Sequence, residues 1–339
     1  MDQKKLNFIS KRLVSSSKGI LAADESTGTI AKRFEVINVE SNYENRRKYR
    51  NILFTTKNLE NYISGIILFD ETIKQKSDNQ KSFVEVLKKK NILVGIKVDK
   101  GAKKLLGSNN EKITEGLDGL SERIQEYKDL GAEFTKWRAV ISIGKNIPSK
   151  KCIRLNSVYL SSYARIVQSH GLVPIVEPEV LMDGDHDISR CYDVTSETLS
   201  VLFEELNNQD VFIGGILLKP NMIVSGTNCK LQASPEEVSK LTLKCLKENV
   251  PNQVPGIVFL SGGQSNELAT KHLNLMNKNS DLSSKLSFSY GRALQQPSIF
   301  SWLGQDQNID QAQRALEKRS RLNSLATLGQ YNSNLEDTL

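Results

Sequence analysis

Eight short apolar segments recur along the whole chain, and they restrict the folds that it can adopt. Each is rich in aliphatic residues and ends in polar or charged ones: Gly19–Glu25, Ile63–Phe69, Ile92–Asp99, Phe134–Val140, Val173–Glu179, Gly214–Lys219, Gly256–Ser261 and Leu286–Arg292. Their starts lie about 28 to 45 residues apart, which leaves room for one helix and two loops each time. Apolar runs of this length are typical of strands buried on both faces. The sequence therefore predicts that strands alternate with helices.

The intervals between these segments carry helix signals. Ser41–Glu44 is a capping-box pattern, and it predicts the start of a helix that runs through Phe54. Asn156 is expected to cap a helix that ends near His170. Both stretches lie between apolar segments, as an alternating chain requires.

Further helices are predicted along the chain. Apolar residues at helical spacing precede Gly131, a predicted C-terminal stop: Leu117, Leu120, Ile124 and Tyr127. Ser234–Glu237 combines a capping serine, a proline in the first turn and a glutamate that can reciprocate the cap. A last helix is expected over about 309–328.

Strict alternation of strands and helices predicts a parallel sheet, and eight units predict a closed (β/α)8 TIM barrel. We expect one domain over residues 1–339, with 1–18 as an N-terminal helical segment and 329–339 as a short C-terminal tail. The alternative is an open, doubly wound sheet. No Gly-x-Gly-x-x-Gly turn follows the first apolar segment, which argues against that alternative.

Composition excludes several classes of protein. The net charge is +7, but Lys and Arg are scattered and aromatic residues make up only 6% of the chain, so no nucleic-acid surface is predicted. No apolar run approaches the roughly 20 residues of a membrane span, and the N-terminus lacks a signal-peptide pattern. The four cysteines are far apart in the sequence and form no Cys-x-x-Cys motif, which indicates that they are reduced thiols. We therefore expect a cytoplasmic protein.

Polar and charged residues stand at the C-terminal ends of seven of the eight predicted strands, often at i, i+2 spacing. They are Asp24 with Ser26, Lys97 with Asp99, Lys136 with Arg138, Glu177 with Glu179, then Lys219, Ser261, and Ser289 with Arg292. Residues two apart on a strand point to the same face. A TIM barrel keeps its active site at the C-terminal mouth, where such side chains would converge. The sequence predicts an active site there.

The chemistry of this site can be limited from its residues. An ammonium such as that of Lys219 is costly to bury, so it is either paired or chemically employed. A lysine crowded by other cations in a desolvated pocket keeps some free amine near neutral pH, which Schiff-base formation requires. Glu177 or Glu179 can then shuttle protons. Ser261–Gly263 and Gly291–Arg292 have the glycine-rich, cationic character of a phosphate site.

Other site hypotheses are weaker. Asp183–Asp187 contains oxygen and imidazole ligands, but a turn-rich loop explains it equally well. The remaining histidines, His170 and His272, fall on predicted helices away from the mouth, so no zinc centre is expected. Trp137 and Trp302 are interpreted as packing residues.

The sequence resembles class I (Schiff-base-forming) fructose-1,6-bisphosphate aldolase over nearly its full length. The matching segments are Leu21–Gly28, Gly95–Gly101, Glu115–Arg123, Lys136–Arg138, Pro174–Glu179, Leu217–Met222, Leu260–Gln264 and Phe288–Leu294. So many long motifs in the same order make the resemblance highly specific.

The resemblance implies a lyase of glycolysis and gluconeogenesis that splits fructose 1,6-bisphosphate into dihydroxyacetone phosphate and glyceraldehyde 3-phosphate. It implies that Lys219 forms the Schiff base and that Glu177 is the main acid/base. Glu179 and Lys136 would assist, and Asp24 would accept the C4-hydroxyl proton. It also implies a cytoplasmic homotetramer that needs no metal or other cofactor.

Two sets of substrate-binding residues are also implied by the resemblance. The C1 phosphate would be held by Ser261, Gly262, Gly263, Ser289, Gly291 and Arg292. The C6 phosphate would be held by Ser26, Thr29, Arg33, Lys97 and Arg138. Two alternatives stay open, which are another Schiff-base barrel of the transaldolase kind and a non-catalytic scaffold that retains the fold.

The C-terminal tail departs from the resemblance. Many eukaryotic members end in a tyrosine that assists proton exchange, but this chain ends at Leu339 and its last tyrosine is Tyr331. We interpret Tyr331 as a helix-end residue. The preference between fructose 1,6-bisphosphate and fructose 1-phosphate is left open.

Overall fold

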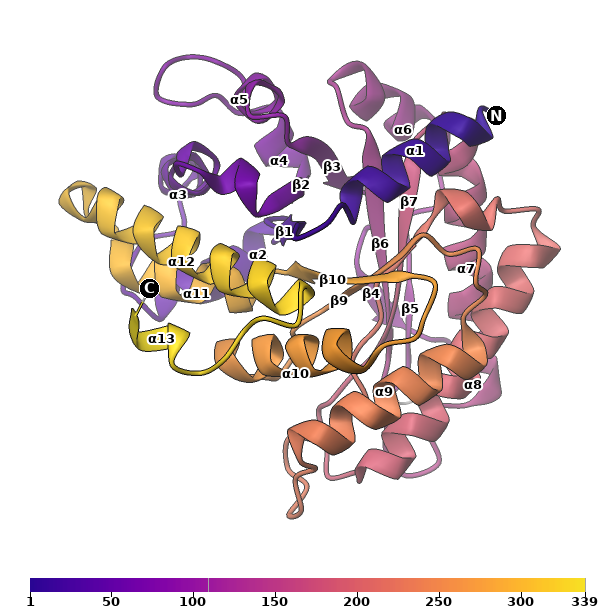
Figure 1. Cartoon of the computed structure of the whole chain (residues 1–339). Helices are drawn as coiled ribbons and strands as arrows, with labels where there is room; N and C mark the ends of the chain where they lie inside the picture. The colour runs from indigo at the N-terminus through magenta and orange to yellow at the C-terminus, as the bar shows by residue number, and fades with distance from the viewer. Residues whose placement is uncertain (109, 339) are drawn as a thin grey trace.

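The computed structural model describes residues 1–108 and 110–338, and its centre is a closed barrel of eight parallel strands (Figure 1). These strands are β1 (Gly19–Ala22), β2 (Ile63–Leu68), β3 (Leu93–Lys97), β6 (Phe134–Ile141), β7 (Val173–Val180), β8 (Leu217–Leu218), β9 (Gly256–Phe259) and β10 (Lys285–Tyr290). Each pairs with its neighbours in chain order, and β1 closes the ring against β10. The predicted (β/α)8 TIM barrel is confirmed, and the open doubly wound sheet is excluded.

Helices surround the barrel (Figure 1). They are α1 (Gln3–Leu13), α2 (Thr27–Glu35), α3 (Tyr43–Thr55), α4 (Asp70–Ile73), α5 (Phe83–Lys89), α6 (Leu120–Asp129), α7 (Lys150–Ser169), α8 (Ile188–Asn208), α9 (Pro235–Asn249), α10 (Asn266–Asn279), α11 (Arg292–Trp302), α12 (Ile309–Thr327) and α13 (Leu335–Thr338). Short 3-10 turns η1 (Leu59–Asn61), η2 (Ile213–Gly215) and η3 (Asp306–Asn308) join some of them. None of the described helices combines the length and apolar character that crossing a membrane requires.

Helix α1 closes the N-terminal end of the barrel. Its buried side chains, among them Leu6 and Leu13, join one apolar cluster with Ile20, Leu93 and Phe134 from the starts of the strands. Because α1 places Leu6, Ile9 and Leu13 at helical spacing on one face, that face can cover the barrel floor. The C-terminal end of the barrel is not covered by α1, and it holds the cavity described below.

Most of the predicted helix boundaries hold. Ser234 caps α9 by accepting a hydrogen bond from the Glu237 N–H, and Pro235 is the first helical residue. Gly131 follows α6 with a φ of +106°, a conformation that suits glycine. The last predicted helix is confirmed as α12.

Three helix predictions were wrong in detail. Asn42 caps α3 in place of Ser41, because its side chain accepts from the N–H of Asn45. Asn156 lies inside α7, and Ser149 caps that helix seven residues earlier. Leu117 precedes α6, which begins at Leu120.

The sixth predicted strand, Gly214–Lys219, is much shorter than expected. Its first residues form the turn η2, and only Leu217 and Leu218 are in β8. The Gly214 carbonyl accepts hydrogen bonds from Asn7 and Ser10 of α1, so this backbone is satisfied by the helix and not by a neighbouring strand.

The other predicted strands begin close to their expected positions but several end earlier. Strand β1 stops at Ala22, so Asp24 and Glu25 lie in the loop that follows it. Asp99 and Ser261 likewise follow β3 and β9. An additional hairpin, β4 (Ala102–Lys104) with β5 (Lys112–Thr114), was not predicted, because its lysine-rich strands carry no apolar alternation.

The C-terminal tail packs against the helices. Tyr331 is buried in the main apolar cluster, and its hydroxyl donates to Glu336. Arg319 of α12 holds the same carboxylate through a salt bridge of 2.6 Å. Burial first, and then the Glu336 carboxylate, raises the pKa of Tyr331 to about 12. Tyr331 is thus not the helix-end residue that was predicted, because α12 ends at Thr327 and α13 begins at Leu335; it anchors the tail between them.

Candidate active site

A cavity of about 550 Å³ lies at the C-terminal mouth of the barrel. All sixteen residues predicted for the site line it: Asp24, Ser26, Thr29, Arg33, Lys97, Lys136, Arg138, Glu177, Glu179, Lys219, Ser261, Gly262, Gly263, Ser289, Gly291 and Arg292. They come from seven of the eight strands and the loops or helices that follow them, so the fold brings together residues from one end of the chain to the other.

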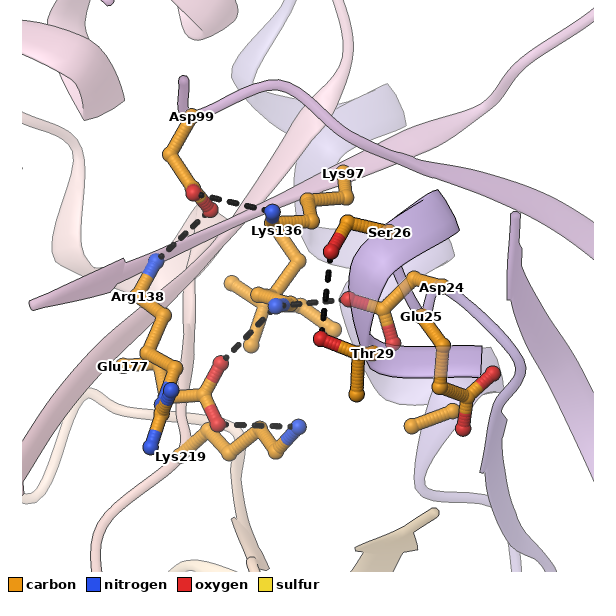
Figure 2. A network of polar contacts seen from close by, with 12 residues as sticks. Asp24, Glu25, Ser26, Thr29, Lys97, Asp99, Lys136, Arg138, Glu177 and Lys219 are labelled. Atoms are coloured by element: carbon orange, nitrogen blue, oxygen red, sulfur yellow. Dashed lines mark hydrogen bonds and ion pairs between the residues drawn. The ribbon is translucent and has the colours of Figure 1, made fainter. Parts of the chain in front are cut away.

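Four charged residues, of which three are buried and Asp24 is partly buried, form a row across the centre of the cavity (Figure 2). The Lys219 Nζ lies 3.0 Å from Glu177 Oε1, and the Lys136 Nζ lies 3.3 Å from Glu177 Oε2. Lys136 also contacts Asp24 Oδ2 at 2.7 Å. Lysine and carboxylate therefore alternate in the order Lys219, Glu177, Lys136, Asp24. Glu177, one of the two glutamates predicted as a proton shuttle, lies directly against Lys219, and the cation Lys136 lies on the other side of that carboxylate.

Neighbouring opposite charges determine the protonation states of Asp24, Glu177 and Lys136. Burial alone would raise the pKa of Asp24, but the ammonium groups of Lys136 and Lys219 outweigh it and hold that pKa well below its usual range. The pKa of Glu177 is lowered in the same way, with burial opposed by Lys136, Lys219 and Arg138. Burial alone would lower the pKa of Lys136, but Asp24 and Glu177 raise it. Both acids are thus carboxylates and Lys136 is an ammonium near neutral pH.

A second polar network flanks the first (Figure 2). Asp99 lies 3.2 Å from the Lys97 Nζ and accepts hydrogen bonds from the backbone N–H groups of Gly101 and Arg138. The Arg138 side chain pairs with Glu179. The sequence predicts Asp99 at the C-terminal end of its strand, but no role in the site was predicted for it. The i, i+2 spacing with Lys97 was the signal for it.

Glu25 also lines the cavity, and it was not predicted as a site residue. Its carboxylate pairs with Arg33 at 2.5 Å and with buried Arg50 at 2.7 Å, and it accepts from Gln295 Nε2 at 2.8 Å. Burial would raise the pKa of Glu25, but Arg33 and Arg50 outweigh it and lower that pKa. Glu25 follows Asp24 directly, but its partners lie elsewhere in the sequence, so no local pattern identified it.

The glycine-rich loops form the far wall of the cavity. Gly263 has a φ of +69°, and the Met182 sulfur lies 2.2 Å from where a Cβ of Gly263 would stand, so any side chain here would be strained and would displace Met182. Gly291 lies just before α11, and Arg292 is the first residue of that helix. Helix N-termini favour anions, which suits a phosphate at this wall.

Arg33 stands between the two predicted phosphate sets. Its Nη2 lies 3.7 Å from where a Cβ of Gly291 would be, so it faces the wall implied for the C1 phosphate. Ser26 and Thr29, implied for the C6 phosphate, are joined by a hydrogen bond of 3.1 Å at the start of α2. The two sets therefore meet at Arg33.

The competing site hypotheses find little support in the geometry. Of the loop Asp183–Asp187 only Asp183 lines the cavity. The described residues contain no group of three or more His, Cys, Asp or Glu side chains that could hold a metal ion. Trp137 and Trp302 are fully buried in the main apolar cluster, as predicted.

His272 is closer to the mouth than its helix suggested. It lies on α10, but its Nδ1 is 2.6 Å from Oε1 of Gln264, the residue after Gly263. Burial lowers the pKa of His272 to about 4, so the ring is neutral. His272 therefore supports the loop that follows β9.

The sequence is similar to known proteins over nearly its whole length. Residues 5–339 match the family model of class I fructose-bisphosphate aldolase. The chain belongs to the class I fructose-bisphosphate aldolase family. Among curated members, a probable class 1 aldolase of Xanthomonas axonopodis pv. citri is 51% identical over 332 residues, which cover 98% of this chain and 99% of that protein. A cytosolic aldolase of Arabidopsis thaliana is 52% identical over 318 residues, covering 93% and 80%.

Solved structures of this aldolase family agree with the fold. The fructose-bisphosphate aldolase of Plasmodium falciparum superposes with a TM-score of 0.96 at 46% identity, covering 98% of this chain and 96% of that one. An aldolase is a lyase, so the chain is an enzyme of that class.

Proposed function

We propose that this aldolase reversibly cleaves fructose 1,6-bisphosphate into dihydroxyacetone phosphate and glyceraldehyde 3-phosphate through a Schiff base on Lys219. The observation that supports it best is the buried pair of Lys219 Nζ and Glu177 Oε1 at 3.0 Å. An amine and a proton acceptor at hydrogen-bond distance are what carbinolamine formation and dehydration need.

The first step uses a proton that the pair already holds. Transfer of one proton from Lys219 to Glu177 gives a free amine and a carboxylic acid at once. The amine adds to the C2 carbonyl of the substrate, and the resulting hydroxyl takes a proton from Glu177 and leaves as water. The iminium that remains is the electron sink for bond cleavage. Lys136, held as an ammonium, keeps the surrounding carboxylates balanced.

Cleavage then needs a base on the other side of the cavity. Asp24 is a carboxylate in the free enzyme, and it is assigned the proton of the C4 hydroxyl. As that proton leaves, the C3–C4 bond breaks and its electrons move to the iminium to form an enamine. Glyceraldehyde 3-phosphate is released first, and protonation at C3 followed by hydrolysis frees dihydroxyacetone phosphate. Glu179, which pairs with Arg138, assists charge balance.

The phosphates are assigned to the two cationic walls of the cavity. The C1 phosphate goes to the glycine-rich wall formed by Ser261, Gly262, Gly263, Ser289, Gly291 and Arg292. The C6 phosphate goes to Ser26, Thr29, Lys97, Arg138 and Arg33. Ser289 Oγ is buried and has no hydrogen-bond partner among the described residues, and a phosphate oxygen would supply one.

The proposal extends to the protein's setting. We expect a cytoplasmic homotetramer in glycolysis and gluconeogenesis that uses no metal or other cofactor. The names of cytosolic relatives in plants support this location. Light scattering on the purified protein measures the mass of the assembly, and a monomer would contradict the tetramer.

A substrate panel tests the proposed reaction. We expect release of glyceraldehyde 3-phosphate from fructose 1,6-bisphosphate in a coupled assay, with slower release of triose from fructose 1-phosphate and no loss of rate in EDTA. A protein active only as a transaldolase-like enzyme would require an acceptor aldehyde. A scaffold would process none of the sugars.

A further inference from the structure

The segment that carries Lys219 is hydrogen-bonded to the neighbouring strands at fewer positions than the other segments of this part of the barrel. Strands β6 and β7 pair along their whole lengths, Phe134–Ile141 with Val173–Val180, whereas β8 pairs with β7 at only two positions. The last backbone hydrogen bond from this segment to β7 runs from the Lys219 N–H to the Val176 carbonyl, at 2.8 Å. The next bond of this parallel ladder would run from the N–H of residue 178 to the Lys219 carbonyl, but Pro178 has no N–H, so the ladder to β7 stops at Lys219.

The side chain of Asn221 takes the place of the missing ladder. Its Oδ1 accepts the N–H of Val180, the last residue of β7, at 3.1 Å. Its Nδ2 donates to Thr195 Oγ1 of α8 and to the Met222 carbonyl, both at 3.1 Å. Asn221 and Thr195 are each only 2% exposed, so water does not compete for these bonds. The side-chain amide of Asn221 thus joins three elements: the end of β7, the segment that follows Lys219, and helix α8.

The side-chain amide of Asn221 connects the segment of Lys219 to the strand of Glu177. Asn221 lies two residues after Lys219, and Val180 directly follows Glu179 on the strand that carries Glu177. On the other side, the Pro220 carbonyl accepts the Leu260 N–H of the next loop at 3.2 Å. Asn221 itself is not among the described residues that line the cavity.

We propose that Asn221 is a positioning residue that fixes the separation of Lys219 Nζ and Glu177 Oε1. The inference rests on the proposed Schiff-base function, since only that chemistry gives the separation its importance. Both the acceptor and the donor of the amide are needed. Without the acceptor the Val180 N–H is left unsatisfied, and without the donor the amide loses its anchor on α8.

Kinetics of variants test this assignment. Asn221→Ala should lower kcat for fructose 1,6-bisphosphate by about 10- to 100-fold, because misplacement of reacting groups by about 1 Å costs that much. KM should change by less than about threefold, since no phosphate contact is touched. Thr195→Val removes the anchor while keeping the side-chain shape, and it should lower kcat by about threefold.

Asn156→Ala is the matched control. Asn156 is equally buried, and its amide also joins a helix to another element, through bonds to Cys152, Lys112 and Thr114. It lies in α7 outside the cavity, so this variant should lose stability to urea while its kcat per folded molecule stays within twofold of wild type.

The results separate this inference from the proposed function. If wild type neither cleaves the sugar nor traps a Lys219 adduct, the function has failed and the positioning role falls with it. If wild type is active but Asn221→Ala keeps kcat within twofold, only the positioning role is overturned. If Asn221→Ala does not fold, Thr195→Val decides: a lower kcat at constant KM supports the role, and an unchanged kcat overturns it.

Discussion

At the N-terminal end of the barrel the strands present Ile20, Leu93 and Phe134, and α1 packs over them in a wholly apolar cluster. At the C-terminal end the same strands and their loops present charged groups such as Lys97 and Lys136 around an open cavity. The backbone architecture is the same at both ends. One end of the barrel therefore supplies stability, and the other gathers paired charged groups of the kind that an active site needs.

Stability and activity should therefore respond to different substitutions. Burying an apolar side chain stabilises the fold wherever it occurs, whereas burying a lysine beside another lysine costs free energy unless carboxylates offset it. At the mouth, Glu177 and Asp24 provide that offset, and they are also the groups assigned to proton transfer.

The largest effect is expected from Lys219→Met. Without the amine no Schiff base can form, so kcat should fall by at least about 10³-fold. Lys90→Met is the control, because Lys90 is also partly buried and paired, with Glu60, but lies outside the cavity. Its kcat should stay close to wild type in a coupled assay. Comparable losses in both variants would contradict the division.

Glu177→Gln should lower kcat by about 10²- to 10⁴-fold, the usual contribution of a general acid/base. Glu205→Gln removes the charge of another buried glutamate, one that pairs with Arg154 on the outer helices. That variant should keep its kcat per folded molecule. Steady-state rates, corrected for the folded fraction by circular dichroism, make the comparison.

Leu13→Ala tests the closed end of the barrel. Leu13 is completely buried, so the cavity left behind should lower the free energy of unfolding by about 2–5 kcal/mol. The kcat at 25 °C should not change. Leu231→Ala, at a residue that is 82% exposed, should shift the free energy of unfolding by less than about 0.5 kcal/mol. Urea unfolding measures both.

Acid should weaken the paired carboxylates of the open end, whereas the closed end should not respond to it. The folded-state pKa values of Asp24 and Glu177 lie below their unfolded values of 3.8 and 4.5, so the stability they contribute is present above those values. It is lost as the pH falls below about 4.5 towards the folded-state pKa values. Asp24→Asn should show a shallower loss of urea stability between pH 6 and pH 3. Leu13→Ala should lower the whole curve without changing its shape, because the α1 cluster holds no ionisable group.

The smallest effect is expected from Tyr331→Phe. Its hydroxyl donates to Glu336, so removing it should cost about 0.5–1.5 kcal/mol of stability. We expect kcat to stay within twofold, since the ring anchors the tail in the apolar cluster. A selective loss of enamine protonation, measured by tritium exchange into dihydroxyacetone phosphate, would instead give Tyr331 a catalytic role.

Local patterns predicted the barrel and most of its site. Apolar runs of the β-strand length and the i, i+2 pairs of charged residues are properties of neighbouring residues, so Lys136 with Arg138 and Glu177 with Glu179 could be placed at the mouth from the sequence. An N-terminal helical segment was also predicted, although not the apolar face of α1 or the surface that this face covers.

Features that depend on distant partners were missed. Glu25 joins the site because Arg50 and Gln295, which lie 25 and 270 residues away, meet it in the folded chain. The shortening of β8 follows from hydrogen bonds between Gly214 and α1, 207 residues apart for Asn7. The ion pair between Lys219 and Glu177 joins the end of β8 to β7. The sequence predicted Glu177 or Glu179 as the proton shuttle beside a lysine crowded by cations, but it could not choose between the two glutamates or give their contacts.

Reductive trapping of the iminium shows whether Lys219 forms the Schiff base. Borohydride added with dihydroxyacetone phosphate should reduce the iminium to a stable amine, and mass spectrometry of the digested protein should place the added mass on Lys219. Without the sugar phosphate no such mass should form. An adduct on another lysine such as Lys136, or no adduct from an active enzyme, would contradict the account.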